Sequence, residues 1–129
     1  LPIGARWPTT KEFVAPLSYA GRVQQLANVT EPAKVALQVV RIGDICIGST
    51  PCETYTEIGQ AFQERSPFEK TFMVELNHGY LGYLPTPRHF KLGGYSTWPG
   101  TNYLESQASE KIVDHLIEMA QELKPTGDR

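Results

Sequence analysis

Two short segments place polar side chains where a strand is expected to end and a helix to begin. The first covers residues 50–59 (TPCETYTEIG), and the second covers residues 77–86 (NHGYLGYLPT). Each follows an apolar run rich in β-branched residues and precedes a helix-start pattern. Ligands commonly bind at such edges of α/β sheets. We therefore expect an acid on the first segment and a tyrosine on the second to form the functional site, with the rest of the chain as scaffold.

The composition is that of an ordinary globular protein. The chain has 129 residues, of which 40% are hydrophobic and 20% charged, so residues 1–129 can form a single domain with its own core. A net charge of -2 predicts no basic surface for nucleic acid. No apolar run reaches membrane-spanning length, and no signal peptide is recognisable. Because the first residue is Leu1 rather than Met, we expect a processed chain or a piece of a longer protein.

The first half of the chain predicts a helical segment and then a β-hairpin. Thr9 and Glu12 have the spacing of a capping box, and a loose apolar stripe up to Val23 predicts one or two short helices. Residues 35–42 alternate as a strand does, and the two-residue Gly43-Asp44 turn has Gly first, as a hairpin turn requires. The returning strand, residues 45–48, is apolar on both faces, so we expect it inside the sheet.

The second half predicts three helices and another strand. Thr50 as N-cap, Pro51 and Glu53 predict a sharp helix start, with Ile58, Ala61 and Phe62 buried and an end at Ser66-Pro67. Residues 71–76 form a strand. A short helix over residues 87–92 begins after Thr86 and stops at Gly93-Gly94. A long final helix has its apolar residues at helical spacing: Ala108, Ile112, Leu116, Met119, Ala120 and Leu123.

This order of elements predicts an α/β or α+β domain. The sheet should be small and mixed, with three or four strands, a hairpin, flanking helices and a long C-terminal helix. So small a sheet could be completed by polypeptide outside this chain.

Glu53 has two interpretations. The Thr50-x-x-Glu53 pattern matches a capping box, in which the glutamate binds backbone N–H groups, and the residues alone favour this role. A carboxylate at a strand-to-helix junction is also well placed as a metal ligand if other ligands come from elsewhere. Glu57, one turn later, is expected to be exposed.

Tyr80 and Tyr83 lie among glycines. Such tyrosines are usually packing anchors whose hydroxyl reaches a backbone group, although the glycines also permit close approach of a strand or a ligand. His78 is interpreted as a hydrogen-bonded turn residue, with metal ligand and general base as alternatives. His89 is expected to be exposed on the short helix, and His115 to flank the apolar stripe of the last one.

The two cysteines are expected to be small apolar core residues without a disulfide. Cys46 lies within an apolar strand. Cys52 falls at the predicted helix start, which would lower its pKa and make it reactive. Metal-ligand Cys pairs, a phosphate loop, a dinucleotide fingerprint and a GxSxG elbow are all absent from the sequence.

Several motifs occur in an order that resembles a known family. They are residues 41–44 (RIGD), 51–53 (PCE), 58–59 with 66–68 (IG and SPF), 79–86 (GYLGYLPT) and 93–95 (GGY). From Arg41 to about Leu123 the chain resembles the C-terminal part of the catalytic domain of neutral or alkaline, non-lysosomal ceramidases, especially their bacterial branch. Residues 6–9 are a weaker match.

The resemblance implies a zinc site. In that family a zinc ion is held by two histidines from the earlier part of the domain, a glutamate in a Pro-x-Glu turn and a tyrosine in a Tyr-x-x-Tyr segment. Carried over to this sequence, the ligands are Glu53 and Tyr83, with Tyr80 as the alternative tyrosine. The implied reaction is attack of a zinc-activated water on the amide carbonyl of an N-acyl sphingoid lipid. His78 falls where relatives often have Asn and receives no role.

The sequence departs from the family because no histidine precedes His78. Zinc hydrolases use about three protein ligands and an open position. We therefore expect a C-terminal fragment of a larger zinc-dependent amidase (the parent protein) that is inactive and free of zinc on its own. Its partners would be the missing N-terminal part of the domain and a lipid amide substrate. The parent would be an exported or membrane-peripheral protein.

Two other function classes remain open. The first is a non-enzymatic α/β domain with an interaction or structural role, in which Glu53 is a helix cap and the tyrosines are core. The second is a cysteine hydrolase using Cys52 with His78, which lacks a group to orient the pair.

A shared metal site makes a geometric prediction. The strands that carry Glu53 and Tyr83 must be neighbours, and both side chains must emerge at the same end. The Tyr83 hydroxyl should also face a surface left uncovered, with an apolar patch, because the rest of the parent would pack there.

Overall fold

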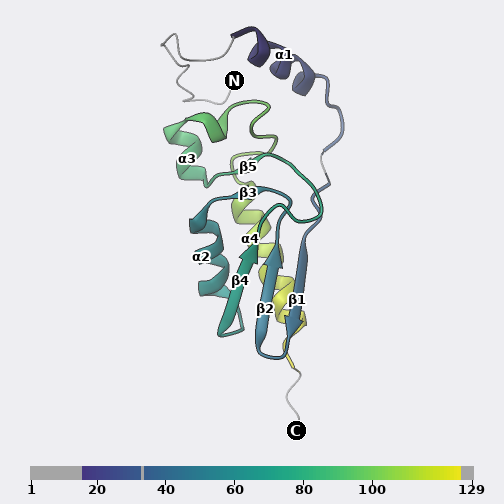
Figure 1. Ribbon diagram of the computed structural model, residues 1–129, viewed down its shortest axis with the longest axis vertical. Helices are drawn as coiled ribbons and strands as arrows, with labels where there is room; N and C mark the ends of the chain where they lie inside the picture. Colours follow the sequence, from purple (N-terminus) through teal and green to yellow (C-terminus); the bar gives the residue numbers. More distant parts are fainter. Residues whose placement is uncertain (1–15, 33, 126–129) are drawn as a thin grey trace.

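A computed structural model describes residues 16–32 and 34–125 of the chain (Figure 1). The predicted Thr9–Glu12 capping box lies outside these residues. The described part is an α+β domain with one small mixed sheet and a second, two-stranded sheet. Its elements are α1 (Pro16–Ala27), β1 (Gln38–Ile42), β2 (Ile45–Ser49), β3 (Glu53–Thr54), α2 (Thr56–Arg65), β4 (Lys70–Val74), β5 (Tyr83–Leu84), α3 (Pro87–Leu92), a 3-10 helix (Tyr95–Thr97) and α4 (Ala108–Glu122).

The main sheet has the strand order β1-β2-β4. β1 and β2 form the predicted antiparallel hairpin, and Gly43 in its turn has a φ of 59°, a conformation that favours glycine. β2 pairs with β4 in parallel, and α2 connects them. The strand with apolar residues on both faces is therefore the central one, as the sequence predicted.

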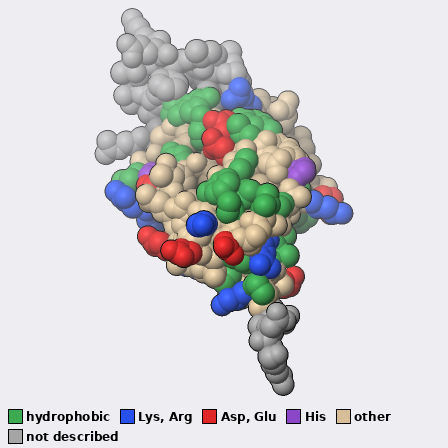
Figure 2. Space-filling view, turned by 60° about the horizontal axis from the view of Figure 1, so that its bottom comes forward, with side chains coloured by type: hydrophobic (Ala, Val, Ile, Leu, Met, Phe, Trp, Pro, Cys, Tyr) green, Lys and Arg blue, Asp and Glu red, His purple; other side chains and the backbone are tan. Residues whose placement is uncertain are grey.

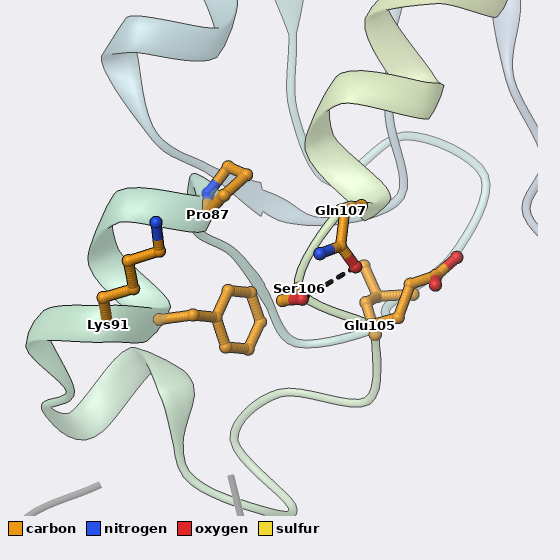
Figure 3. A pocket seen from close by; sticks show the side chains of 7 residues that line it. Pro87, Lys91, Glu105, Ser106 and Gln107 are labelled. Carbon is orange, nitrogen blue, oxygen red and sulfur yellow. Dashed lines mark hydrogen bonds between the residues drawn. The ribbon is translucent and has the colours of Figure 1, made fainter. Parts of the chain in front are cut away.

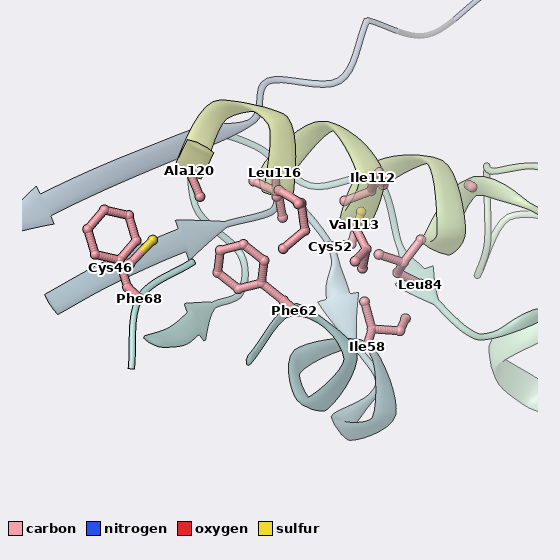
Figure 4. Close-up of a cluster of buried hydrophobic side chains, with 12 residues drawn as sticks. Cys46, Cys52, Ile58, Phe62, Phe68, Leu84, Ile112, Val113, Leu116 and Ala120 are labelled. Atoms are coloured by element: carbon pink, nitrogen blue, oxygen red, sulfur yellow. The ribbon is translucent and has the colours of Figure 1, made fainter. Parts of the chain in front are cut away.

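Helices α2 and α4 cover one face of this sheet. Gly48 of β2 has no side chain, and a Cβ atom there would lie 2.6 Å from Cε1 of Phe62 in α2, whose ring is fully buried. α4 lies behind the sheet in Figure 1. Its buried stripe meets α2 and the strands in one core (Figure 4). The buried apolar residues of that core are Cys46, Cys52, Ile58, Phe62, Phe68, Leu84, Ala108, Ile112, Val113, Leu116, Ile117 and Ala120.

The predicted start of α2 is wrong. The helix begins at Thr56, with Tyr55 as its N-cap, rather than at Thr50. The capping-box interpretation of Glu53 therefore fails, because Glu53 lies in β3. The physical reason is that the backbone of this segment bonds to distant partners. The Thr50 N–H donates to the Val74 carbonyl at 3.0 Å, and the Pro51 carbonyl accepts from the Leu81 N–H at 2.8 Å.

β1, β4, α3 and α4 agree with the sequence apart from their ends, whereas β5 and the 3-10 helix were not predicted. β1 begins at Gln38, because residues 35–37 precede the ladder and Val35 and Leu37 pack on the core instead. β4 ends at Val74, and Leu76 then turns with a φ of 55°. α3 has the predicted cap at Thr86 and stop at Gly93. In the predicted stripe of α4, Met119 is half-buried and Leu123 follows the helix and is exposed. Among the described residues, no helix has the length and apolar character needed to cross a bilayer.

Candidate functional site

Glu53 and Tyr83 lie directly opposite each other in the small second sheet. β3 and β5 pair in parallel, with Glu53 facing Tyr83 and Thr54 facing Leu84. The Glu53 N–H donates to the Gly82 carbonyl at 3.0 Å, and the Tyr55 N–H to the Leu84 carbonyl at 3.2 Å. The two segments that the sequence singled out are thus joined backbone to backbone, and the strands carrying the acid and the tyrosine are neighbours, as expected.

Gly82 allows this pairing to form. Its φ is 72°, and a Cβ atom at this position would lie 2.2 Å from the Thr101 carbonyl oxygen, far inside contact distance. That carbonyl accepts the Tyr83 N–H at 2.9 Å, and the Asn102 side chain donates to the Tyr83 carbonyl at 2.9 Å. The glycine therefore permits close approach of another backbone segment, one of the two roles inferred from the sequence.

The Glu53 carboxylate acts on both tyrosines of the Tyr-x-x-Tyr segment. The Tyr80 hydroxyl donates to Glu53 Oε1 at 3.0 Å. A hydrogen bond to the same carboxylate, with burial and its negative charge, raises the pKa of Tyr83 to about 12. The same hydrogen bond raises the pKa of Tyr80. Both hydroxyls thus interact with the Glu53 carboxylate, whereas the sequence predicted that they would reach a backbone group.

Further aromatic rings surround this pair. Tyr95 stands edge-on to Tyr83, with ring centroids 5.8 Å apart, and edge-on to Trp98 at 5.7 Å. Tyr80, Tyr95 and Tyr103 are 60%, 52% and 47% exposed, so the cluster reaches the surface. Residue-by-residue reasoning missed Tyr95 as a neighbour of Tyr83. The only signal for it was the Gly93-Gly94-Tyr95 motif in the family resemblance.

The histidines lie away from Glu53 in their contacts. His78 Nε2 is 2.9 Å from Gln38 Oε1, which makes it the hydrogen-bonded turn residue that the sequence favoured. His115 is exposed beside Glu118. The predicted exposure of His89 is wrong, because its ring packs edge-on to Tyr55 at 4.5 Å and its Nδ1 lies 2.8 Å from Thr86 Oγ1. In the part of the chain that the structure describes, no three His, Cys, Asp or Glu side chains could hold a metal ion together.

Cys46 and Cys52 are free thiols in the core, with no exposed surface. Burial raises the pKa of Cys52 to about 11. The predicted lowering of this pKa by a helix start is therefore wrong, because α2 begins only at Thr56. The Cys52 thiol is therefore buried and protonated, and His78, the base considered for it, hydrogen-bonds to Gln38 instead. These contacts do not support a cysteine hydrolase.

Two cavities lie beside the start of α4. One of about 440 Å³ is lined by Pro87, Phe90, Lys91, Leu104, Glu105, Ser106 and Gln107 (Figure 3). The other, of about 490 Å³, lies between residues 32–37 and α4 and has Tyr103 in its wall. A Cβ atom on Gly82 would lie 3.2 Å from the Tyr103 ring, so the second cavity adjoins the tyrosine cluster.

No family model, curated protein or solved structure matches this chain.

Proposed function

We propose that this chain is the C-terminal part of a zinc-dependent amidase of the neutral-ceramidase type, and that Glu53 and Tyr83 are two of its zinc ligands. The observation that carries the proposal is the direct pairing of Glu53 with Tyr83 across β3 and β5, where the carboxylate raises the pKa of the phenol to about 12. The substrate would be an N-acyl sphingoid lipid or a related N-acyl amide.

The two side chains suit a zinc ion in both chemistry and placement. Carboxylate oxygens bind zinc at about 2.0–2.2 Å, and two oxygen ligands of one tetrahedral ion lie roughly 3–4 Å apart. Glu53 and Tyr83 are direct partners in the parallel pair of β3 and β5, so both side chains start from adjacent backbone positions. In this proposal Glu53 and Tyr83 would supply two of the roughly three protein ligands of a catalytic zinc. The other ligands would come from the rest of the parent.

Each residue has a distinct role in the proposed site. Glu53 would bind the metal through a carboxylate oxygen while the Tyr80 hydroxyl holds its Oε1 atom at 3.0 Å. Tyr83 would release its phenolic proton, because only the phenolate is a strong oxygen ligand. Zinc, when bound, would supply an activated water for addition to the amide carbonyl. Net hydrolysis places the water oxygen on the acyl carbon, breaks the C–N bond and transfers a proton to the departing amine.

The test is made in the full-length protein, with zinc content and hydrolysis of a short-chain fluorescent ceramide as readouts. Glu53→Gln and Tyr83→Phe should both lose zinc and activity, whereas Tyr103→Phe, a nearby half-exposed tyrosine, should keep both. Tyr80→Phe should weaken metal binding by about 10–100-fold, as loss of a partner of a ligand typically does. Full zinc content in Tyr83→Phe would remove this tyrosine from the site.

The isolated chain provides a second arm of the test. Residues 1–129 should retain no zinc after dialysis and should not hydrolyse the fluorescent ceramide. Turnover that survives purification and depends on this chain would contradict the fragment interpretation.

A non-enzymatic interaction or structural domain is the second candidate. The observation that favours it is that the Glu53 carboxylate already accepts a hydrogen bond from the Tyr80 hydroxyl at 3.0 Å, a partner that is not a metal. In that case Glu53→Gln should lower stability equally in the isolated chain and in the full-length protein, with no bound zinc in either.

A further inference from the structure

β4 is an edge strand of the main sheet. The strand order is β1-β2-β4, so β4 pairs with β2 on one side and with no described strand on the other. Figure 1 shows β4 at one margin of the sheet, with α2 beside it. The unpaired N–H and carbonyl groups of such an edge form a template for another extended chain. β4 can therefore accept a further strand wherever its outer backbone groups are free.

The outer backbone groups of this edge belong to Met73 and Glu75. The Val74 carbonyl accepts the Thr50 N–H at 3.0 Å, and the Leu76 N–H donates to the segment that follows β2 at 3.2 Å. Backbone groups of successive residues in an extended strand point to opposite sides, so those of Met73 and Glu75 point away from β2. In the described part of the chain, no turn, loop or side chain hydrogen-bonds to the N–H or carbonyl of either residue.

A cavity of about 410 Å³ follows the free edge of β4. Phe72 and Met73 both line it, although successive side chains of a strand point to opposite faces of the sheet. The cavity therefore lies at the edge, between the two faces. α2 forms the opposite wall through Gly59, Gln60 and Gln63. We call this cavity the edge groove. From Phe72 to the end of the free edge it is as long as about three residues of extended chain, roughly 10 Å.

The lining of the edge groove suits a peptide. Gln60 and Gln63 are exposed, and each amide side chain can donate and accept hydrogen bonds. Phe72 is 43% exposed and offers a ring to an apolar side chain. An extended peptide that adds to a sheet edge uses both kinds of contact, with its backbone on the strand and alternate side chains in the groove.

Glu75 gives one end of the edge groove a negative charge. Its Oε2 atom accepts the Thr54 N–H at 2.7 Å, and no Lys, Arg or His side chain of the described residues forms an ion pair with it. On the face drawn in Figure 2, basic and acidic side chains are interspersed, so no large surface of one sign appears there. The local charge of Glu75 therefore favours a peptide with a basic side chain at this end.

The walls of the edge groove favour a single strand over a folded partner. α2 stands beside the free edge, so whatever enters must fit between a strand and a helix. A paired strand lies only about 4.7–4.9 Å from its neighbour. A second copy that used the same edge would carry its own α2 beside it, and two helices would have to share the space next to one strand pair.

We propose that the edge groove binds an extended peptide segment of a partner protein, which adds as a strand to the free edge of β4 and places a basic side chain near Glu75. This inference goes beyond the proposed function and does not depend on it, because neither Glu53 nor Tyr83 lines the edge groove.

The test uses the 1–129 chain and a short blocked peptide of alternating threonine and valine with one central lysine. Binding is followed by NMR, through the shifts and the hydrogen exchange of the Met73 and Glu75 amides. Two matched peptides carry N-methyl groups on one or the other alternate set of backbone amides. A further peptide has glutamine in place of the lysine.

The lysine peptide should bind with a Kd below about 1 mM and slow the exchange of the Met73 amide. One N-methyl peptide should bind about five- to a hundredfold more weakly, as the loss of two hydrogen bonds implies, and the other should bind almost normally. Glu75→Gln should weaken binding of the lysine peptide by about two- to fivefold and leave the glutamine peptide unchanged.

Two variants provide the matched control for the groove itself. Gln60→Trp, at an exposed position of α2, should fill the edge groove and abolish binding. Gln121→Trp makes the same change at an exposed position of α4 and should leave binding intact.

Unchanged Met73 and Glu75 amides at peptide concentrations up to about 1 mM would overturn the inference. Equal binding of the two N-methyl peptides would also overturn it, because strand addition uses only one set of amides. Shifts at Met73 that grow with protein concentration in the absence of peptide would overturn it in favour of a second copy.

Discussion

Glu53 and Tyr83 are direct partners in the parallel pair of β3 and β5, and the carboxylate of the first raises the pKa of the phenol of the second to about 12. Backbone register, rather than side-chain flexibility, brings them together. The acid keeps the phenol protonated, so the metal-free pair stores a proton that a metal ion would have to displace. Zinc binding through Tyr83 should accordingly release protons and weaken as pH falls.

Replacing Glu53 by glutamine should lower the pKa of Tyr83 from about 12 towards the ordinary tyrosine value near 10. The amide can still accept a hydrogen bond, but it carries no negative charge to oppose the phenolate. Ultraviolet titration of tyrosinate in Glu53→Gln, with Tyr83→Phe to identify the transition, measures the change. Glu57→Gln, whose carboxylate is exposed on α2, is the control and should leave the titration unchanged.

The same pair predicts how stability changes in alkali. The pKa of Tyr83 is about 12 in the folded chain and about 10 in an unfolded one. The unfolded state therefore loses its proton first, so this contribution is fully present below pH ~10 and is lost as pH rises towards ~12. Urea unfolding should show a steeper alkaline loss in wild type than in Tyr83→Phe. Parallel curves for the two proteins through this window would contradict the hydrogen bond.

Gly82→Ala should destabilise the chain strongly, by about 3 kcal/mol or more, because the strained φ and a clash with backbone act together. The new Cβ would lie 2.2 Å from the Thr101 carbonyl oxygen, which cannot move without breaking its bond to the Tyr83 N–H. Gly21→Ala is the matched control, since nothing lies within 4 Å of its Cβ position in α1. That change should raise stability by up to about 1 kcal/mol. Denaturant unfolding of both variants would measure these changes in the free energy of unfolding.

Gly48→Ala should cost about 1–3 kcal/mol by overpacking the core against the Phe62 ring. The smaller, more flexible side chain in Phe62→Leu should make room, so the double variant should lose less than the sum of the two single changes. A double-mutant cycle measures this coupling. Strict additivity would mean that the ring moves aside without cost.

The fold could be predicted where local pattern and burial agree. The Gly43 turn, the central position of β2 and the buried stripe of α4 all followed from residue type and spacing. The hairpin and α4 take their hydrogen bonds from near neighbours in the chain, whereas β2 also pairs with β4, about 25 residues away, and was recognised by its apolar pattern. Their ends shifted by a few residues, as at Gln38, because the last bonds of a strand depend on its partner.

The site was harder to predict from the sequence, because its hydrogen bonds join residues far apart in the chain. The residues from Thr50 to Glu53 match a capping box when they are considered alone. In the structure the Glu53 N–H donates to the Gly82 carbonyl instead, and β3 replaces the expected helical turn. His89 is half-buried because its ring packs against Tyr55, a residue of a distant segment that the pattern of α3 does not reveal. The strand-end pattern already predicted that an acid and a tyrosine share the site, but the choice of Glu53 and Tyr83 came only through the family resemblance.

The shortness of β3 and β5 bears on the dynamics of the molecule. Each strand has two residues, whereas every strand of the main sheet has five. Pairs held by so few bonds open at lower free energy than a central strand, so their amides should exchange with solvent long before those of β2. The acid and the phenol thus lie on the part of the fold that opens first. Any ion or polypeptide that locks this pair would turn a transient opening into a slow step that sets how quickly the site loads and empties.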